Sequence, residues 1–154
     1  MIHVVFYEPR IPPNTGNAIR MTACMQATLH LVEPLGFVLS DAHLRRAGLD
    51  YHDLAHVVVH PDLDAALAAV SPGRVYAFTG SATTRFTDVR YQPGDALLFG
   101  PEPSGLPAEV LDDTRLTDRL RIPMIPGARS MNLSNSAAVA AYEVWPQRDF
   151  AGGV

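Results

Sequence analysis

The chain has 154 residues, of which 47% are hydrophobic and 18% are charged, and this composition is typical of a globular protein rather than a disordered one. Its net charge of −4 and pI of about 5.8 argue against a protein that binds nucleic acid through its total charge. A single cysteine, Cys24, excludes an internal disulfide framework and a zinc site built from cysteines.

The basic residues are unusual in kind. All 12 are arginines, and no lysine is present. Arginine is the side chain best suited to bidentate contacts with phosphate, so the positions of the arginines matter more than their sum. No apolar run is long enough to cross a membrane, and no basic region precedes the apolar start, so we expect a cytoplasmic protein without a signal peptide.

The first third of the chain predicts a strand, a helix and a second strand. Ile2–Phe6 is a short apolar run typical of a buried strand, and three prolines break the following loop, Glu8–Gly16. A helix is predicted from Asn14 or Thr15, and Leu29–Val32 is predicted to be the second strand. Strand, helix and strand in this order form the unit of a parallel sheet.

The rest of the chain continues this alternation. The predicted elements are a helical turn at residues 44–47 after Asp41, a strand at Val57–Val59, a helix at Asp62–Val70, a strand at Val75–Thr79, a polar loop at Gly80–Gly94, a strand at Ala96–Phe99, a helix from Pro107 to Leu111, a strand at Leu120–Met124 and a final helix at Leu133–Trp145. We therefore predict one α/β domain over residues 1–154, with a mainly parallel, Rossmann-like sheet.

Three loops follow predicted strands and are rich in proline, glycine, asparagine and serine: Tyr7–Gly16, Gly100–Gly105 and Pro126–Asn132. Ligands bind at the carboxyl ends of the strands in parallel sheets, so these loops are the candidate site. The structural alternative is that they are ordinary connections between elements.

The same loops carry a family resemblance. Asn14-Thr-Gly-Asn-Ala-Ile-Arg20, Phe99-Gly-Pro-Glu102-Pro-Ser-Gly105-Leu-Pro and Ile122-Pro-Met followed by Ser130-Met-Asn-Leu-Ser-Asn135 resemble the three ordered motifs of the SPOUT (SpoU–TrmD) RNA methyltransferases. The resemblance covers nearly the whole chain and is closest to the minimal TrmL type, whose members methylate the 2′-hydroxyl of the tRNA wobble nucleotide.

The resemblance implies properties that spacing cannot show. It implies a deep trefoil knot at the C-terminal end that forms the S-adenosylmethionine pocket, and a homodimer whose active site is shared between chains. It also implies methylation of the wobble nucleotide, position 34, of leucine tRNAs. The alternatives are a 2′-O-methyltransferase of another tRNA or rRNA site, and a non-catalytic RNA-binding dimer.

The resemblance also assigns roles, carried over position by position. The implied catalytic residues are Arg20, Asn14, Glu102 and Asn132, and the implied cofactor-binding residues are Phe78, Gly100, Ile122 and Ser130. Each has a structural alternative: Asn14 and Asn132 are good helix N-caps, Phe78 and Ile122 are typical core residues of strands, and Arg20 and Glu102 need no role on a solvated surface.

Other residues are candidates for binding partners. Six arginines are candidate contacts to the tRNA backbone, with a solvated surface as the alternative; they are Arg10, Arg45, Arg46, Arg85, Arg90 and Arg129. Tyr142 and Trp145 are predicted to face either the partner or their own chain. His52, His56 and His60 recur at a spacing of four, but a strand at Val57–Val59 separates them, so we expect no metal site.

A nucleotide-binding oxidoreductase on a doubly wound sheet is a third alternative. It predicts a Gly-x-Gly-x-x-Gly turn after the first strand. The chain instead has Tyr7-Glu-Pro-Arg-Ile-Pro-Pro-Asn-Thr-Gly at that point, so this alternative ranks last.

Overall fold

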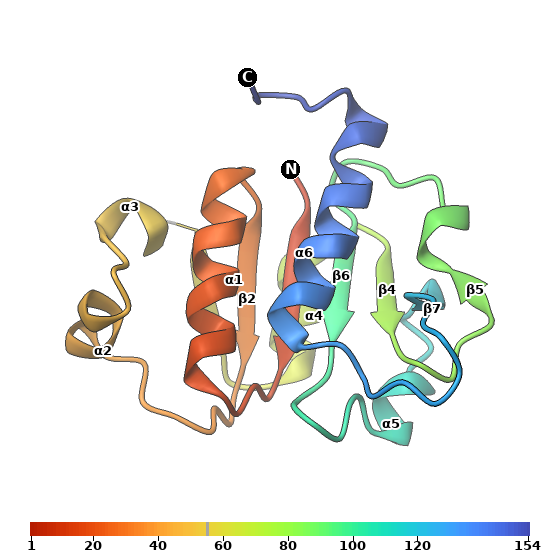
Figure 1. Cartoon of the computed structure of the whole chain (residues 1–154), viewed down its shortest axis with the longest axis horizontal. Helices are drawn as coiled ribbons and strands as arrows, with labels where there is room; N and C mark the ends of the chain where they lie inside the picture. Colours follow the sequence, from red (N-terminus) through yellow and green to blue (C-terminus); the bar gives the residue numbers. More distant parts are fainter. Residues whose placement is uncertain (55) are drawn as a thin grey trace.

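One parallel sheet organises the protein. The computed structural model describes residues 1–54 and 56–154, with Tyr51 described by its backbone alone. Within the described chain seven strands pair in the order β3-β2-β1-β6-β4-β7-β5, and every pairing is parallel (Figure 1). The strands are β1 (His3–Tyr7), β2 (Thr28–Val32), β3 (Val57–His60), β4 (Val75–Phe78), β5 (Thr84–Arg85), β6 (Ala96–Phe99) and β7 (Asp118–Arg121). The predicted α/β class with a parallel sheet is confirmed.

Helices cover both faces of the sheet. The helices are α1 (Pro12–Cys24), α2 (Asp41–Arg46), α3 (Tyr51–Leu54), α4 (Leu63–Val70), α5 (Ala108–Leu111) and α6 (Leu133–Val144), with short 3-10 turns at Phe86–Asp88 and Pro146–Arg148. α1 and α6 lie side by side on one face and bury Ile19 and Ala140 against Leu31, Leu97 and their neighbours (Figure 1). α4 and α5 cover the other face, where they form a second apolar cluster. Two packed faces are the usual way in which a parallel sheet is buried.

The first helix begins earlier than the sequence predicts. α1 starts at Pro12 rather than at Asn14 or Thr15, with Ile11 as its N-cap. Proline is well suited to the first positions of a helix, because its fixed φ is helical and its missing N–H has no partner there. Asn14 is therefore inside the first turn, and its predicted capping role is wrong.

The last strand is displaced in the opposite direction. β7 is Asp118–Arg121, whereas the sequence predicts Leu120–Met124. Pairing with β4 joins Tyr76 to Asp118 and Phe78 to Leu120, and the strand ends two residues before Pro123, which cannot donate to the ladder. The apolar pattern is misleading here because Met124 lies exposed in the following loop.

The segment Gly80–Gly94, predicted to be a loop, contains short elements. β5 and the 3-10 turn at Phe86–Asp88 lie within it, and Phe86 and Tyr91 are buried. The Tyr91 hydroxyl donates to the Phe86 carbonyl at 2.7 Å, and burial raises the pKa of this phenol. Two buried aromatic side chains thus hold a segment whose polar composition indicates no structure.

The segment between β2 and β3 forms an arm beside α1. The predicted helical turn after Asp41 is confirmed as α2, whereas α3 was not predicted. α2 and α3 lie outside the sheet, next to α1 (Figure 1). We call residues 41–54 the arm.

Candidate active site

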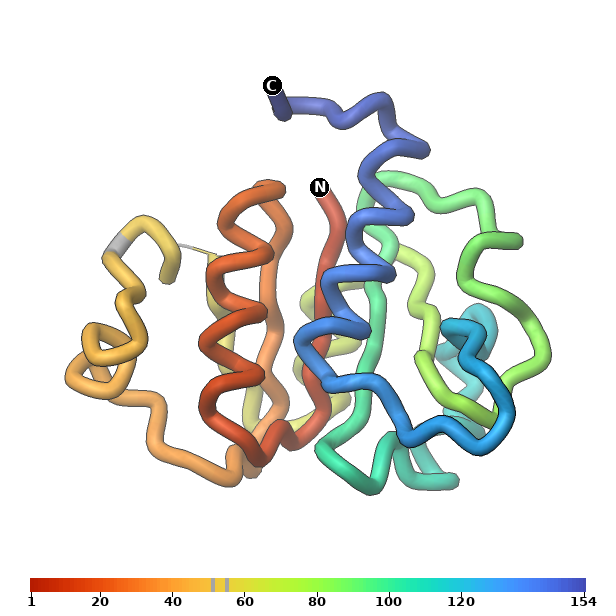
Figure 2. Tube along the Cα trace, viewed as in Figure 1, coloured from red at the N-terminus to blue at the C-terminus, as the bar shows by residue number. Residues whose placement is uncertain are grey.

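One cavity lies at the carboxyl edge of the sheet, where the loops after β1, β4, β6 and β7 meet. Its volume is about 440 Å³, within the usual range for small-molecule sites. Residues 78–80, 99–106 and 130–133 line it, together with Asn14 and Ile122. Figure 2 shows how the segment between β7 and α6 runs along this edge to reach the start of α6, beside the start of α1. Segments far apart in the sequence therefore border one cavity.

The cavity wall combines apolar and polar groups. Phe78 stacks on Phe99, with 4.6 Å between ring centroids and an interplanar angle of 20°. Leu106, Ile122 and Leu133 extend this apolar surface. Thr79, Ser130 and Asn132 add hydroxyl and amide groups. A wall of this kind suits a ligand with both flat apolar rings and polar substituents.

Three side chains from different loops form a hydrogen-bonded network beside the cavity. The Asn14 amide nitrogen donates to Glu102 Oε1 at 2.8 Å, and the Asn132 amide nitrogen donates to Asn14 Oδ1 at 2.8 Å. Asn14 is buried, so both halves of its amide need partners, and both have them. The network connects α1 to the loops that follow β6 and β7.

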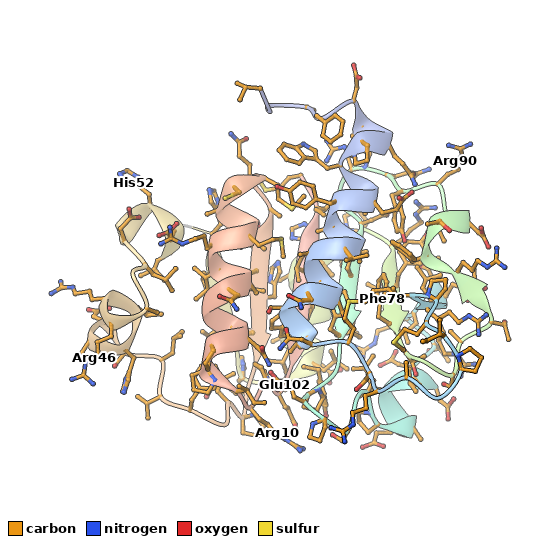
Figure 3. The ribbon with its side chains drawn as sticks, viewed as in Figure 1. Arg10, Arg46, His52, Phe78, Arg90 and Glu102 are labelled. Atoms are coloured by element: carbon orange, nitrogen blue, oxygen red, sulfur yellow. The ribbon has the colours of Figure 1, made fainter. Side chains whose placement is uncertain are left out.

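Both carboxylate oxygens of Glu102 are occupied. Oε1 accepts from Asn14, and Oε2 accepts from the backbone N–H of Arg10 at 2.8 Å. Figure 3 shows Glu102 and Arg10 at the same edge of the molecule. The carboxylate therefore holds the β1–α1 loop against the β6 loop, and it makes no contact with Arg20 among the described residues.

Asn132 has two structural functions. Its side-chain oxygen accepts from the backbone N–H groups of Ser134 and Asn135, at 2.9 and 3.2 Å, so it is the N-cap of α6. Its amide nitrogen donates to Asn14. The cap and the interloop bond use different atoms of the amide, so the predicted N-cap is confirmed, and the catalytic role that the resemblance implies stays a prediction.

Close backbone packing shapes the β6 loop. An added Cβ on Gly100 would approach the Leu106 nitrogen to 2.1 Å and the Gly105 carbonyl carbon to 2.3 Å. Gly105 has φ of +73°, a conformation that favours glycine. Only glycine at position 100 permits this tight loop, which brings backbone groups to the cavity.

Arg20 is the one predicted site residue that the structure does not bring to this cavity. Seven of the eight border it: Asn14, Phe78, Gly100, Glu102, Ile122, Ser130 and Asn132. Arg20 instead faces the arm, where its Nη2 donates to the Gly48 carbonyl and lies 3.5 Å from Asp53 Oδ2. Its side chain is 55% exposed.

The sequence assigned no site role to three groups that shape these regions: the Phe99 ring, the Arg10 backbone N–H and the Asp53 carboxylate. Phe99 resembles an ordinary strand residue, Arg10 contributes a backbone group that has no side-chain signature, and Asp53 is one carboxylate among many. The only available signal was position, because Phe99 and Arg10 lie within the loops at the carboxyl edge.

The candidate RNA-binding arginines are all exposed. Arg45 and Arg46 lie at the end of α2, and Arg10 and Arg129 lie in loops at the carboxyl edge. Arg85 is the last residue of β5, and Arg90 follows the 3-10 turn at Phe86–Asp88. Figure 3 shows Arg46 on the arm and Arg90 at the other side of the molecule. Their exposure agrees both with RNA contact and with simple solvation.

The C-terminal aromatic residues pack within the chain. Trp145 makes edge contacts with Tyr142 and Phe150, with centroids 5.5 Å apart in each pair. Tyr142 is nevertheless 45% exposed, and so is available to a partner.

A row of three histidines crosses β1, β2 and β3, beneath α4. His3 Nδ1 is 2.9 Å from His30 Nε2, and His30 Nδ1 is 2.8 Å from His60 Nε2. Burial, with a smaller effect of the two neighbouring rings, lowers the pKa of His30 to about 4. Burial also lowers the pKa values of His3 and His60. Of the histidines that recur at a spacing of four, His52 lies on α3 and His60 lies on β3. These two therefore do not share one helix face, as the predicted strand implies.

Within the described residues, no helix has both the length and the apolar composition needed to span a bilayer.

The sequence and fold match known RNA-modifying proteins. A profile of the SpoU rRNA methylase family matches residues 1–142. The tRNA (cytidine(34)-2′-O)-methyltransferase of Methylovorus glucosotrophus is 51% identical over the full length of both chains, and that of Escherichia coli K12 is 50% identical over all of this chain and 98% of its own. A solved structure concerning "the 2-OH methylation of C/U34 on tRNA" superposes with a TM-score of 0.87 at 44% identity, and covers 97% of each chain.

Proposed function

Because the chain belongs to the SpoU rRNA methylase family, we propose that it transfers a methyl group from S-adenosylmethionine to the ribose 2′-hydroxyl of the wobble nucleotide, position 34, of leucine tRNAs. One observation carries the proposal. The three motifs meet at one cavity, in a chain whose full length matches tRNA (cytidine(34)-2′-O)-methyltransferases. A tRNA substrate also leads us to propose a cytoplasmic location.

The cavity suits S-adenosylmethionine by the chemistry of its wall. Phe78, Ile122 and Leu106 offer apolar surface to an adenine ring, and Ser130 and Thr79 offer hydroxyl groups to a ribose. The tight loop at Gly100 provides backbone donors and acceptors at short range. When bound, the cofactor supplies an electrophilic methyl group on a sulfonium.

The protein residues orient the acceptor and stabilise its charge. In such a transfer the ribose 2′-oxygen would bond to the methyl carbon as the bond from that carbon to the sulfonium sulfur breaks, leaving a neutral thioether. The hydroxyl proton would pass to water, so negative charge would develop on the oxygen. Guanidinium groups remain protonated in proteins, so Arg20 acts by electrostatic stabilisation rather than as a base. We propose that Asn14, Glu102 and Asn132 hold the loops around the reacting groups, as their mutual hydrogen bonds suggest.

We propose a homodimer in which Arg20 serves the cavity of the partner. Arg20 lies outside the cavity of its own chain, so a shared site would account for its position. α1 and α6 lie side by side, and Val139 and Tyr142 of α6 are more than two-fifths exposed, so this face offers apolar surface to a second copy. We likewise propose one domain over residues 1–154 and a knot where the β7–α6 segment passes the β6 loop.

The first experiment is a transfer assay. Purified protein, labelled S-adenosylmethionine and total small RNA are incubated, and the labelled nucleotide is mapped. Label on the ribose of position 34 in leucine tRNAs supports the proposal. Label at another ribose retains the reaction and changes the substrate, and binding of cofactor and RNA without transfer favours the non-catalytic dimer.

A mixing experiment tests the shared site. Arg20→Ala and a cavity variant, Gly100→Val, are each inactive in the proposed scheme. Mixed and re-equilibrated, they form heterodimers with one intact composite site, so about a quarter of wild-type activity returns in a statistical mixture. If Arg20 serves its own chain, no activity returns.

A further inference from the structure

The arm fixes the position of Arg20. Its guanidinium has both of its described protein contacts through Nη2, to the carbonyl of Gly48 and to the carboxylate of Asp53. We infer that Asp53 is a positioning residue, which orients the Arg20 guanidinium toward RNA through this contact. The inference rests on the proposed role of Arg20 in methyl transfer.

The Asp53 carboxylate is itself held in place. Its Oδ2 accepts from the backbone N–H of Asp50 at 2.9 Å, while the Asp53 backbone N–H donates back to Asp50 Oδ1 at 3.0 Å. That second bond is the main reason why the pKa of Asp50 lies below its ordinary value. The Asp53 side chain is only 15% exposed. A carboxylate fixed in this way can fix a guanidinium in turn.

The second contact also depends on a defined backbone. Gly48 has φ of +73°, and its N–H donates to the Arg45 carbonyl at 3.0 Å. Leu44 and Leu49, on either side of this turn, are buried against the main core. The arm is therefore anchored to the domain at the point where it contacts Arg20, and Arg45 and Arg46 lie on the same short segment.

The geometry favours a role in function over a role in stability. The Arg20 side chain is 55% exposed, and exposed ion pairs add little to folding stability. With Nη2 held, the other guanidinium donors remain available to a phosphate or ribose oxygen. Holding one edge of the group in advance reduces the orientational freedom that is lost when RNA binds.

Kinetics of Asp53 variants test this role. Asp53→Asn is expected to lower kcat for RNA methylation about tenfold, because the guanidinium is no longer oriented. The KM for S-adenosylmethionine stays unchanged, since Asp53 does not border the cavity. Asp53→Glu recovers most of the rate. In an Arg20→Ala background, Asp53→Asn produces no further decrease.

Asp113 offers a matched control. Its carboxylate is also 15% exposed and pairs with Arg115 at 2.6 Å, away from the cavity and the arm. Asp113→Asn is expected to leave kcat unchanged. An unchanged kcat in Asp53→Asn overturns the inference, and so does a decrease of the same size in the Arg20→Ala background.

A measurement without catalysis separates this inference from the proposed function. The side-chain Nε–H resonance of Arg20 can be assigned by its loss in Arg20→Ala. In RNA-free protein we expect this resonance to shift, and its proton to exchange faster with water, in Asp53→Asn but not in Asp113→Asn. An unmoved resonance overturns the contact, whatever the activity. If the wild type methylates no RNA, the proposed function fails, and a moved resonance shows that the contact itself stands.

A backbone variant gives an independent check. Gly48→Ala strains a left-handed residue at the Arg20 contact, and Gly94→Ala applies the same strain at φ of +88° with no neighbour near the added Cβ. Similar losses of stability are expected in both, with reduced kcat in Gly48→Ala alone. Equal kcat values in the two variants count against the inference.

Discussion

The carboxyl edge of the sheet lies at the start of α1, and the arm lies beside the middle of α1. Different kinds of contact stabilise these two regions. At the carboxyl edge, side chains from three distant loops bond directly to one another: Asn14, Glu102 and Asn132. The arm is held by local bonds: Ser40, directly before the arm, caps α2, and Asp50 accepts from backbone N–H groups of its own turn. The arm contacts α1 by apolar packing and by the Arg20 contact.

The difference shows where preorganisation resides. The cavity is preformed, because the amide nitrogen and the amide oxygen of the buried Asn14 both have partners on loops that are distant in the sequence, Glu102 and Asn132. The arm keeps its own shape. It carries the guanidinium groups of Arg45 and Arg46 on α2, and it contacts the guanidinium of Arg20, which belongs to α1. A rigid cavity suits a small cofactor, and a locally built surface suits a large, charged partner such as RNA.

Arg20→Ala is the substitution for which we expect the largest effect, because it removes the guanidinium that contacts the arm. We expect methyl transfer to fall by about 10²–10³-fold, as when one charge-stabilising donor is lost. Stability changes little because the side chain is exposed. Turnover with saturating RNA, alongside a thermal unfolding curve, checks both statements. A change of less than tenfold in turnover would contradict a central role for Arg20.

The free energy of unfolding at low pH tests the burial of the histidines on the sheet beneath both regions. Burial gives the His30 ring a folded-state pKa of about 4, below its ordinary value of 6.5, so the unfolded chain binds protons more readily. The stabilising effect is complete above about pH 6.5 and is lost as pH falls toward 4. We expect a loss of up to about 3 kcal/mol from this ring alone.

The other groups facing His30 act in the same direction. The pKa values of His3 and His60 are also lowered, although Asp62 opposes the shift at His60 and the N-terminal amine adds to that at His3. Urea unfolding between pH 7 and pH 4 measures the effect, and His30→Gln is expected to flatten the curve. An equally steep curve in that variant would contradict this origin.

Asn132→Ala breaks the cavity network and the cap of α6 together. We expect a loss of about 2 kcal/mol, which lowers Tm by roughly 4–8 °C in a chain of this size. Cofactor binding weakens as well, because the loop after β7 is no longer tied to Asn14. Calorimetry and cofactor titration measure the two effects.

Asn135→Ala is the matched control for the cap. Asn135 is exposed in the first turn of the same helix, and its recorded contact to Asn132 uses its backbone. A change below about 0.5 kcal/mol is expected there. Equal losses of stability in Asn132→Ala and Asn135→Ala would show that the network adds nothing to the free energy of unfolding.

The smallest expected effect concerns the surface of the arm. Arg46→Ala removes one candidate phosphate contact, so we expect RNA affinity to fall a few-fold and the salt dependence to decrease by about one ion. Cofactor binding stays unchanged. RNA binding between 50 and 200 mM salt measures the slope. An unaltered slope would assign Arg46 to the solvated surface.

Most of the fold was predictable from local pattern. Apolar runs identified the central strands, and Asp62 and Pro107 lie where the structure has N-caps. The errors occurred where tertiary pairing overrides local preference. β7 begins at Asp118 because its partner β4 sets the register, and Phe86 and Tyr91 order a polar segment by burial.

The site divides in the same manner. The sequence by itself marked three loops as the candidate site, because they follow strands whose carboxyl ends share one edge, and its resemblance to the family assigned roles to residues in and near those loops. Only the tertiary structure decided their relations. Asn14 is in the first turn of α1 and bonds to Glu102 and Asn132, 88 and 118 residues away, whereas Arg20 turns to the arm. Hydrogen-bond partners at such separations depend on how the loops pack, and no local pattern encodes that packing.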